Sequence, residues 1–191
     1  MTGTKARVGA GSGRENETKM GVRNYLIEGG SGSGKTAAAT ELERRGHHAV
    51  HGDRTLAYQG DPVTGARLDP LMRAQHGADP DFISRHHIWD EDQVRALVAD
   101  QTHTATFFCG GARNSQSFIT LFDAVFVLEI DLATLNHRLD GRPGEWGSEP
   151  AERALILRQH QTRENLPKNA IPIDATRPIT EVVDEILSRC G

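Results

Sequence analysis

Three absences narrow the functions open to this chain of 191 residues. It has only two cysteines, Cys109 and Cys190, and neither belongs to a metal-binding or redox motif, which suits a reduced cytosolic protein. No apolar run approaches the roughly 20 residues of a membrane span, and the N-terminus lacks the apolar core of a signal peptide. A formal net charge of −4 gives no basic footprint for nucleic acid. We therefore expect a cytoplasmic protein with no membrane or nucleic-acid partner; the oligomeric state is left open.

The composition suits one folded domain behind a polar tail. A hydrophobic content of 37% over this length is enough for a single core. Residues 1–20 are rich in Gly, Thr, Lys, Glu and Asn, so they cannot bury enough apolar surface to offset the entropy of ordering. We expect a flexible tail over residues 1–20 and a single domain over residues 21–191.

A glycine-rich segment after the first apolar run matches the phosphate-binding pattern G-x-x-x-x-G-K-[ST]. Residues 25–27 before it are strand-like and residues 37–42 after it are helix-forming, which is the context that the motif requires. Glycines let backbone N–H groups converge on a polyphosphate, the lysine adds positive charge, and the last hydroxyl can bind Mg²⁺. The predicted nucleotide-binding residues are Gly29, Gly30, Ser31, Gly32, Ser33, Gly34, Lys35 and Thr36, with Lys35 catalytic and Thr36 the Mg²⁺ ligand.

Further apolar runs alternate with helical patterns along the chain. Strands are expected at residues 48–51, 104–109, 124–130 and 170–174, in addition to the first. This alternation predicts a three-layer α/β/α fold with a five-stranded parallel sheet. The second strand brings Asp53, and the third brings Gly110 and Gly111, to the carboxyl edge of the sheet, where ligands bind in open parallel sheets.

Two irregular segments interrupt this pattern. Residues 54–89 hold many Gly and Pro breakers, which predicts short helices forming an acceptor-binding flap. Within it, Tyr58, Arg85 and His87 are candidates for a polar and aromatic pocket, whereas packing is the expected role of Trp89. A glycine-rich lid is expected at about residues 140–150.

Helix signals fill the remaining segments. Asp90 and Asp131 are expected N-caps, and Ser148 is expected to cap the helix that follows the lid and carries Arg153, Arg158 and Arg163. The helix after Asp131 repeats Leu132, Leu135 and Leu139 at helical spacing, a short helix is expected near residues 115–122, and residues 179–187 form a closing amphipathic helix.

In the order of its motifs, the chain from about Arg23 to Ile186 resembles the small P-loop kinases of the adenylate kinase, shikimate kinase and gluconate kinase group. The residues that carry the resemblance are the phosphate loop, Gly52-Asp53 after the second strand, the helix Leu135–Arg142 that leads into the lid, and Ile173–Thr176 before the last helix. The resemblance implies a P-loop kinase that uses ATP and Mg²⁺.

The resemblance also implies roles for individual residues. Asp53 becomes the catalytic base or the group that orients the acceptor hydroxyl. Arg138 and Arg142 would be catalytic arginines of the lid, and Arg138 would also contact the adenine of the nucleotide. The segment Asp174, Ala175 and Thr176 would pack against adenine, and the predicted acceptor-binding residues are Asp53, Gly110, Gly111 and Arg113.

At two positions the chain departs from the pattern of this group. His51 stands where the gluconate and adenylylsulfate kinases have the first acid of Asp-Gly-Asp, which puts a metal contact from this position in doubt. Cys109 stands in the place of the acid in the Asp-Gly-Phe-Pro-Arg motif of nucleoside monophosphate kinases. If that alignment holds, Arg113 would grip an acceptor phosphate; if the Gly-Gly-Gly turn of shikimate kinases is the better match, Gly110 and Gly111 would line a pocket for a hydroxylated molecule.

The sequence therefore predicts an ATP-dependent phosphotransferase that acts on a small molecule, with a nucleoside or nucleotide as the first choice of acceptor and a sugar-like or other hydroxylated metabolite as the alternative. A nucleotide-binding regulator is the competing hypothesis, and it lacks a guanine-reading Asn-Lys-x-Asp motif here. The nine histidines have no cysteine or carboxylate partners at zinc-ligand spacing, so we expect no structural zinc.

Overall fold

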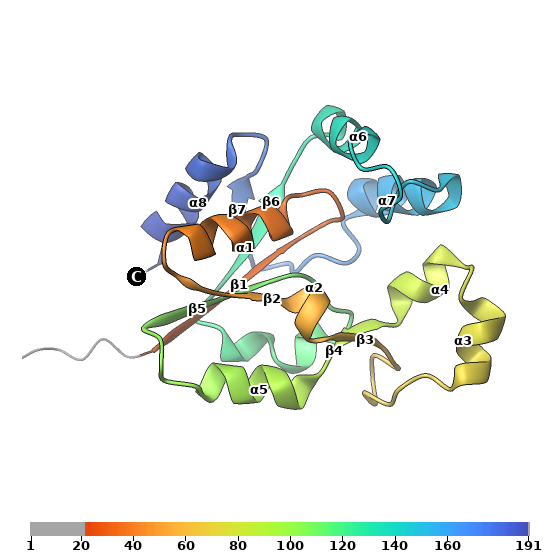
Figure 1. Cartoon of the computed structure of the whole chain (residues 1–191), viewed down its shortest axis with the longest axis horizontal. Coiled ribbons are helices and arrows are strands. Elements are labelled where there is room, and N and C mark those ends of the chain that lie inside the picture. The colour runs from red at the N-terminus through yellow and green to blue at the C-terminus, as the bar shows by residue number, and fades with distance from the viewer. Residues whose placement is uncertain (1–21, 191) are drawn as a thin grey trace, which may run out of the picture.

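A computed structural model describes residues 22–190; the predicted tail, residues 1–20, lies outside this range. Five parallel strands form the main sheet in the order β2-β5-β1-β6-β7 (Figure 1). They are β1 (Arg23–Gly29), β2 (His48–His51), β5 (Ala105–Cys109), β6 (Ala124–Glu129) and β7 (Ile171–Asp174). Ile27 of β1 lies opposite Cys109 of β5 and Phe126 of β6. The predicted five-stranded parallel sheet is confirmed.

Helices cover both faces of this sheet, so the three-layer prediction is also confirmed. Tyr25 and Ile27 are buried under α1 (Lys35–Arg44) and α8 (Ile179–Ser188). Leu26, which points to the opposite face as strand alternation requires, is buried with α5 (Glu91–Ala99). Figure 1 shows α1 and α8 on one side of the sheet and α5 on the other. The predicted helix near residues 115–122 is instead two 3-10 turns, η1 (Ser115–Ser117) and η2 (Ile119–Leu121).

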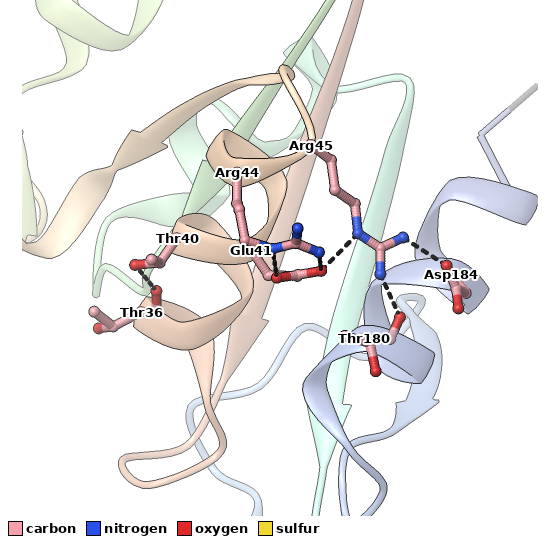
Figure 2. A network of polar contacts seen from close by, with 7 residues as sticks. All are labelled: Thr36, Thr40, Glu41, Arg44, Arg45, Thr180 and Asp184. Carbon is pink, nitrogen blue, oxygen red and sulfur yellow. Dashed lines mark hydrogen bonds and ion pairs between the residues drawn. The ribbon is translucent and has the colours of Figure 1, made fainter.

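A polar network joins the phosphate-loop helix to the closing helix (Figure 2). The buried carboxylate of Glu41 accepts hydrogen bonds from Arg44 and Arg45, and Arg45 continues to α8, where it donates to the Thr180 carbonyl at 2.8 Å and to Asp184 at 2.5 Å. These bonds lower the pKa of Glu41 to about 2. The network therefore ties the two helices on this face to each other.

A small cluster beside the sheet joins the two helices that flank residues 141–149, the segment predicted to be a lid. Leu135 and Leu139 of α6 (Leu132–Asp140) pack against Ile156 of α7 (Pro150–Thr162). Leu132 is 53% exposed and takes no part in this core. Asp131 caps α6 by accepting from the Thr134 N–H at 2.7 Å, as predicted.

Two predictions about α7 are wrong. Its N-cap is Glu149, and Pro150 occupies the first turn, so Ser148 lies one residue outside the cap position. Arg163 is the C-cap residue in a left-handed conformation, with φ of 55°, and so lies just beyond the helix.

The flap between β2 and α5 contains short helices, as predicted, and also a hairpin that was not predicted. The helices are α2 (Gly52–Thr55), α3 (Pro70–His76) and α4 (Pro80–Arg85). The strands β3 (Ala57–Gln59) and β4 (His87–Trp89) pair in antiparallel fashion, with Tyr58 opposite Ile88. Asp69 and Asp79 cap α3 and α4 through side-chain hydrogen bonds, each followed by a proline in the first turn. None of the helices in the described range is long and apolar enough to cross a membrane.

Candidate active site

The phosphate loop joins the end of β1 to the start of α1. Gly34 is the N-cap of α1 and has φ of 107°, a left-handed conformation that strongly favours glycine. Within residues 22–190, the backbone N–H groups of Gly32, Gly34, Lys35 and Thr36 make no hydrogen bond, which leaves them free for an anion. The strand, loop and helix predicted from the motif are present.

Lys35 and Ser33 complete this cradle. The Lys35 ammonium donates to the carbonyls of Gly29 at 2.7 Å and Gly30 at 3.1 Å. Burial lowers the pKa of Lys35, while the carboxyl groups of Asp53 and Glu28 act in the opposite direction. The Ser33 hydroxyl is buried and has no hydrogen-bond partner among the described residues. Free amides, an orphan hydroxyl and a desolvated cation all suit a bound polyphosphate.

The two arginines predicted for the lid lie beside the phosphate loop. The Arg138 guanidinium donates to the carbonyls of Gly32 at 3.1 Å, Ser33 at 2.9 Å and Ala175 at 2.7 Å. Arg142 donates from Nε to the Arg138 carbonyl at 3.3 Å, and a Cβ atom at Gly32 would lie 3.3 Å from its Nη2. Arg138 therefore links the loop to the segment after β7.

That segment is the one predicted to pack against adenine. Asp174 accepts hydrogen bonds from the Thr176 N–H at 3.0 Å and the Thr176 hydroxyl at 2.7 Å, which closes a tight turn. Ala175 is buried at the centre of the turn, and its carbonyl faces Arg138. Arg153 and Arg158 bind elsewhere: Arg153 pairs with Asp140, and Arg158 pairs with Asp81 of α4.

Asp53 lies at the carboxyl end of β2, next to the glycine turn after β5. Its Oδ1 accepts from the Gly111 N–H at 3.0 Å and from His87 Nε2 at 3.3 Å. Partial desolvation opposes ionisation of Asp53, whose side chain is 42% exposed, but the His87 bond, the Lys35 charge and the Gly111 N–H outweigh it, so its pKa lies below the ordinary value. A Cβ atom at Gly110 would lie 2.6 Å from Asp53 Oδ1, so this approach requires glycine.

Arg113 is held by the flap. Its Nε donates to the Ser84 carbonyl and its Nη2 to the Ser84 hydroxyl, both at 2.8 Å. Gln159 of α7 donates to the same hydroxyl at 2.9 Å. Ser84 of α4 thus joins the glycine turn, the flap and the helix after the lid.

A cavity of about 340 Å³ opens between Asp53 and the flap hairpin. It includes two residues predicted for the acceptor pocket, Tyr58 and His87, while Arg85 lines neither this cavity nor the next and Trp89 is buried in the core. A second cavity of about 490 Å³ lies beside it, between α3 and α4. The first cavity is lined by Asp53, Ala57, Tyr58, Gln59, Arg67, Leu68, Arg73 and His87.

Arg67 and Arg73 are cavity residues that the sequence did not single out. Arg67 lies over the Tyr58 ring at 4.3 Å from its centroid. Within the described part of the chain, neither arginine has a carboxylate partner, whereas most of the other arginines there are paired. Nothing in their spacing distinguished them from solvated flap arginines.

Comparisons with known proteins identify the fold of this site. No protein-family model and no curated protein sequence matches the chain. Among solved structures, a gluconokinase from Sinorhizobium meliloti 1021 matches with a TM-score of 0.52 and 17% identity over 87% of this chain and 90% of that chain. A shikimate kinase from Aquifex aeolicus vf5 matches with a TM-score of 0.50 and 14% identity over 86% of this chain and 94% of that chain. The chain has the fold of the P-loop kinases.

One buried acid of this P-loop kinase fold was missed by the sequence analysis. Glu28, on β1 directly before the phosphate loop, is only 2% exposed. Burial raises its pKa to about 8, opposed by the charges of Lys35 and Arg113 and by a hydrogen bond from the Ala112 backbone. The available signal was its position in an apolar strand, on the same face as the buried Leu26.

At the two positions where the related kinases have acids, this chain has His51 and Cys109, and neither can serve as a carboxylate. His51 contacts Glu43 of α1 at 3.2 Å, and Cys109 is a buried thiol whose pKa burial raises well above its usual value. Within residues 22–190, no group of three or more His, Cys, Asp or Glu side chains is arranged to hold a metal ion. The exposed Thr36 hydroxyl at the start of α1 fits the Mg²⁺ of a bound nucleotide, because such sites complete the coordination with phosphate oxygens.

Proposed function

We propose that this protein is an ATP-dependent phosphotransferase that moves the γ-phosphoryl group of Mg-ATP to a small molecule bound in the cavity beside Asp53. The observation that carries the proposal is the position of Asp53. It lines the cavity and also lies close enough to Lys35 of the phosphate loop for the lysine charge to lower its pKa. One carboxylate therefore connects the nucleotide half of the site with the acceptor half.

In the proposed reaction, the loop amides and Lys35 hold the nucleotide phosphates. The Asp53 carboxylate orients the acceptor hydroxyl, whose oxygen forms a bond to the γ-phosphorus while the bond from that phosphorus to the bridging oxygen of ADP breaks. The hydroxyl proton passes to Asp53 and then to water. Arg138 and Arg142 neutralise charge that develops on the phosphoryl group. Mg²⁺, held by Thr36, would supply further neutralisation.

The chemistry of the cavity favours an acceptor that carries a negative charge. Arg67 and Arg73 provide two guanidinium groups without carboxylate partners in the described range, and a phosphate or carboxylate of the acceptor would pair with them. A nucleotide and a sugar acid both meet this requirement. The likeness to a gluconokinase and a shikimate kinase favours a sugar acid. The apolar residues Phe82 and Ile83 of the adjoining cavity favour a nucleotide.

A steady-state assay tests the proposal. ADP release from Mg-ATP would be measured with gluconate, shikimate, adenosine and AMP, each against a reaction without acceptor. We expect acceptor-dependent release with at least one of them and none with Lys35→Ala. Acceptor-independent hydrolysis alone, with a strong preference for GTP over ATP, would instead support a nucleotide-binding regulator.

Asp53→Asn separates catalysis from nucleotide binding in the same assay. We expect turnover to fall about 10²- to 10⁴-fold, as for the loss of a group that handles the proton, while the Kd for ATP changes less than about threefold. Equal losses of turnover and ATP affinity would assign Asp53 to structure rather than catalysis.

A further inference from the structure

The contact between His87 and Asp53 is a feature of the site that neither the phosphate loop nor the lid explains. We propose that His87 is a positioning residue that holds one oxygen of Asp53 so that the other oxygen faces the acceptor hydroxyl. This inference rests on the proposed phosphotransferase function. The role of Asp53 follows from its place in the site, whereas the role of His87 follows only from the geometry of the contact.

The two oxygens of Asp53 have different surroundings. Oδ1 accepts from the Gly111 N–H at 3.0 Å and from His87 Nε2 at 3.3 Å. Oδ2 accepts no hydrogen bond from any residue between 22 and 190. Because a carboxylate only accepts, His87 must carry its proton on Nε2 for this bond. With Oδ1 occupied by two donors, Oδ2 is the oxygen left for a ligand in the cavity.

His87 is itself fixed by the turn that carries the other donor. The Arg113 N–H donates to the His87 carbonyl at 2.9 Å. Two residues along β4, the buried Asn114 side chain accepts from the Trp89 N–H at 3.0 Å and donates to the Trp89 carbonyl at 2.9 Å. Three hydrogen bonds therefore join the strand β4 to the turn 110–114, and both donors to Asp53 lie in these two segments.

Trp89 anchors these two segments in the core. Its indole fills the space that two glycines leave open, since a Cβ atom would lie 2.1 Å from the ring at Gly52 and 2.5 Å from it at Gly110. His87 and Trp89 are two residues apart on β4 and so point to the same side of the strand. The buried tryptophan thus sets the direction in which the histidine reaches Asp53.

The charges around Asp53 assign positioning rather than proton transfer to His87. The charge of Lys35 in the phosphate loop lowers the pKa of Asp53, and Arg67 and Arg73 line the same cavity as Asp53. The Lys35 charge already favours the ionised carboxylate, so Asp53 accepts the hydrogen bond of the acceptor hydroxyl through Oδ2 without a second base to deprotonate it. His87 contributes a fixed donor that selects one rotamer of Asp53.

Two variants of similar polarity separate these roles. The amide of Gln reaches about as far as Nε2 of histidine, whereas the amide of Asn reaches only about as far as Nδ1. Both variants would be assayed for ADP release with gluconate, shikimate, adenosine and AMP, together with the Kd for ATP and the melting temperature. His86→Gln is the matched control, because His86 precedes His87 but lines neither cavity.

We expect His87→Gln and His86→Gln to keep turnover within about threefold of the wild type. His87→Asn should lose about 10- to 100-fold in kcat with little change in ATP affinity, because a catalytic group is then misplaced. In an Asp53→Asn background, His87→Asn should cause no further loss, because His87 acts through Asp53. Full activity of His87→Asn, or equal losses in both backgrounds, would overturn the role of His87 while leaving the proposed function intact. Wild-type protein without acceptor-dependent turnover would overturn the proposed function and this inference together.

Discussion

Asp53 and Glu28 are two carboxyl groups that one site holds in opposite protonation states. Hydrogen bonds and the Lys35 charge keep the pKa of Asp53 below its usual value despite partial desolvation. Glu28, almost fully buried, has a pKa of about 8 and is mostly protonated at neutral pH. Environments that separate two carboxyl groups in this way are common where one of them must act as a charged group.

Glu28 makes the stability of the fold depend on pH. Its pKa rises from 4.5 in the unfolded chain to about 8 in the folded one, so between these values the folded state holds a proton that the unfolded state has lost. Stability is therefore lost as the pH rises from about 4.5 to about 8. Glu28→Gln removes this dependence. Relative to the wild type, its free energy of unfolding should therefore rise by up to about 4 kcal/mol between pH 5 and pH 8.

Urea denaturation at pH 5 and pH 8 measures this change. The exposed Glu181→Gln is the control, and its difference from the wild type should stay constant. The same difference between Glu28→Gln and the wild type at both pH values would show that Glu28 does not bind a proton on folding.

The sequence predicted those site residues that follow directly from strand ends. The phosphate loop, Asp53 and Gly111 each come after a strand of the parallel sheet, so the topology brings them to one edge. His87 was predicted for the acceptor pocket but not as a partner of Asp53. Glu28, Arg67 and Arg73 were not assigned to the site because their roles depend on packing. Glu28 faces the site through the pleat of β1, and the other two reach it only once the flap has folded over the sheet.

At the scale of elements, the hairpin strand β4 is the link between the flap and the sheet. The Asn114 side chain satisfies both backbone groups of Trp89, which lie in the buried core. Asn114→Ala would leave a buried N–H and a buried C=O without partners, and we expect a loss of about 1–3 kcal/mol in the free energy of unfolding, the cost of unsatisfied buried groups.

Urea denaturation at neutral pH measures this loss, with Gln116→Ala on the exposed side of η1 as control. The Asn114 variant should also show a lower kcat, because the donors to Asp53 loosen. A stability within about 0.5 kcal/mol of the wild type, the range of ordinary surface substitutions, would show that β4 is held by its apolar contacts alone.

The sequence predicted the strands of the main sheet and the periodic helices well, and it missed the shortest strands. Residues 179–187 match α8 closely because their apolar stripe is complete, and the predicted strand at 48–51 coincides with β2. The strands β3 and β4 were missed because three residues are too few to show alternation. Ser148 is not the N-cap of α7, because Pro150 occupies the first turn and Glu149 is the N-cap residue.

For the whole molecule, the strand order divides the site into two halves. The phosphate loop follows the central strand β1. Toward one edge, β5 and β2 end in the glycine turn and Asp53, which face the flap; toward the other, β6 and β7 lead to Arg138 and Ala175. Sequence periodicity predicted parallel strands but carries no information on their order, so this division became visible only in the structure.

The fate of the γ-phosphoryl group tests this division most directly. The protein would be incubated with Mg-ATP and each of gluconate, shikimate, adenosine and AMP, and the acceptors analysed by mass spectrometry and ³¹P NMR. The account predicts that one acceptor gains a phosphoryl group in an amount equal to the ADP formed, and that Lys35→Ala forms neither product. Release of inorganic phosphate at the same rate with and without every acceptor, and no phosphorylated acceptor, would contradict it.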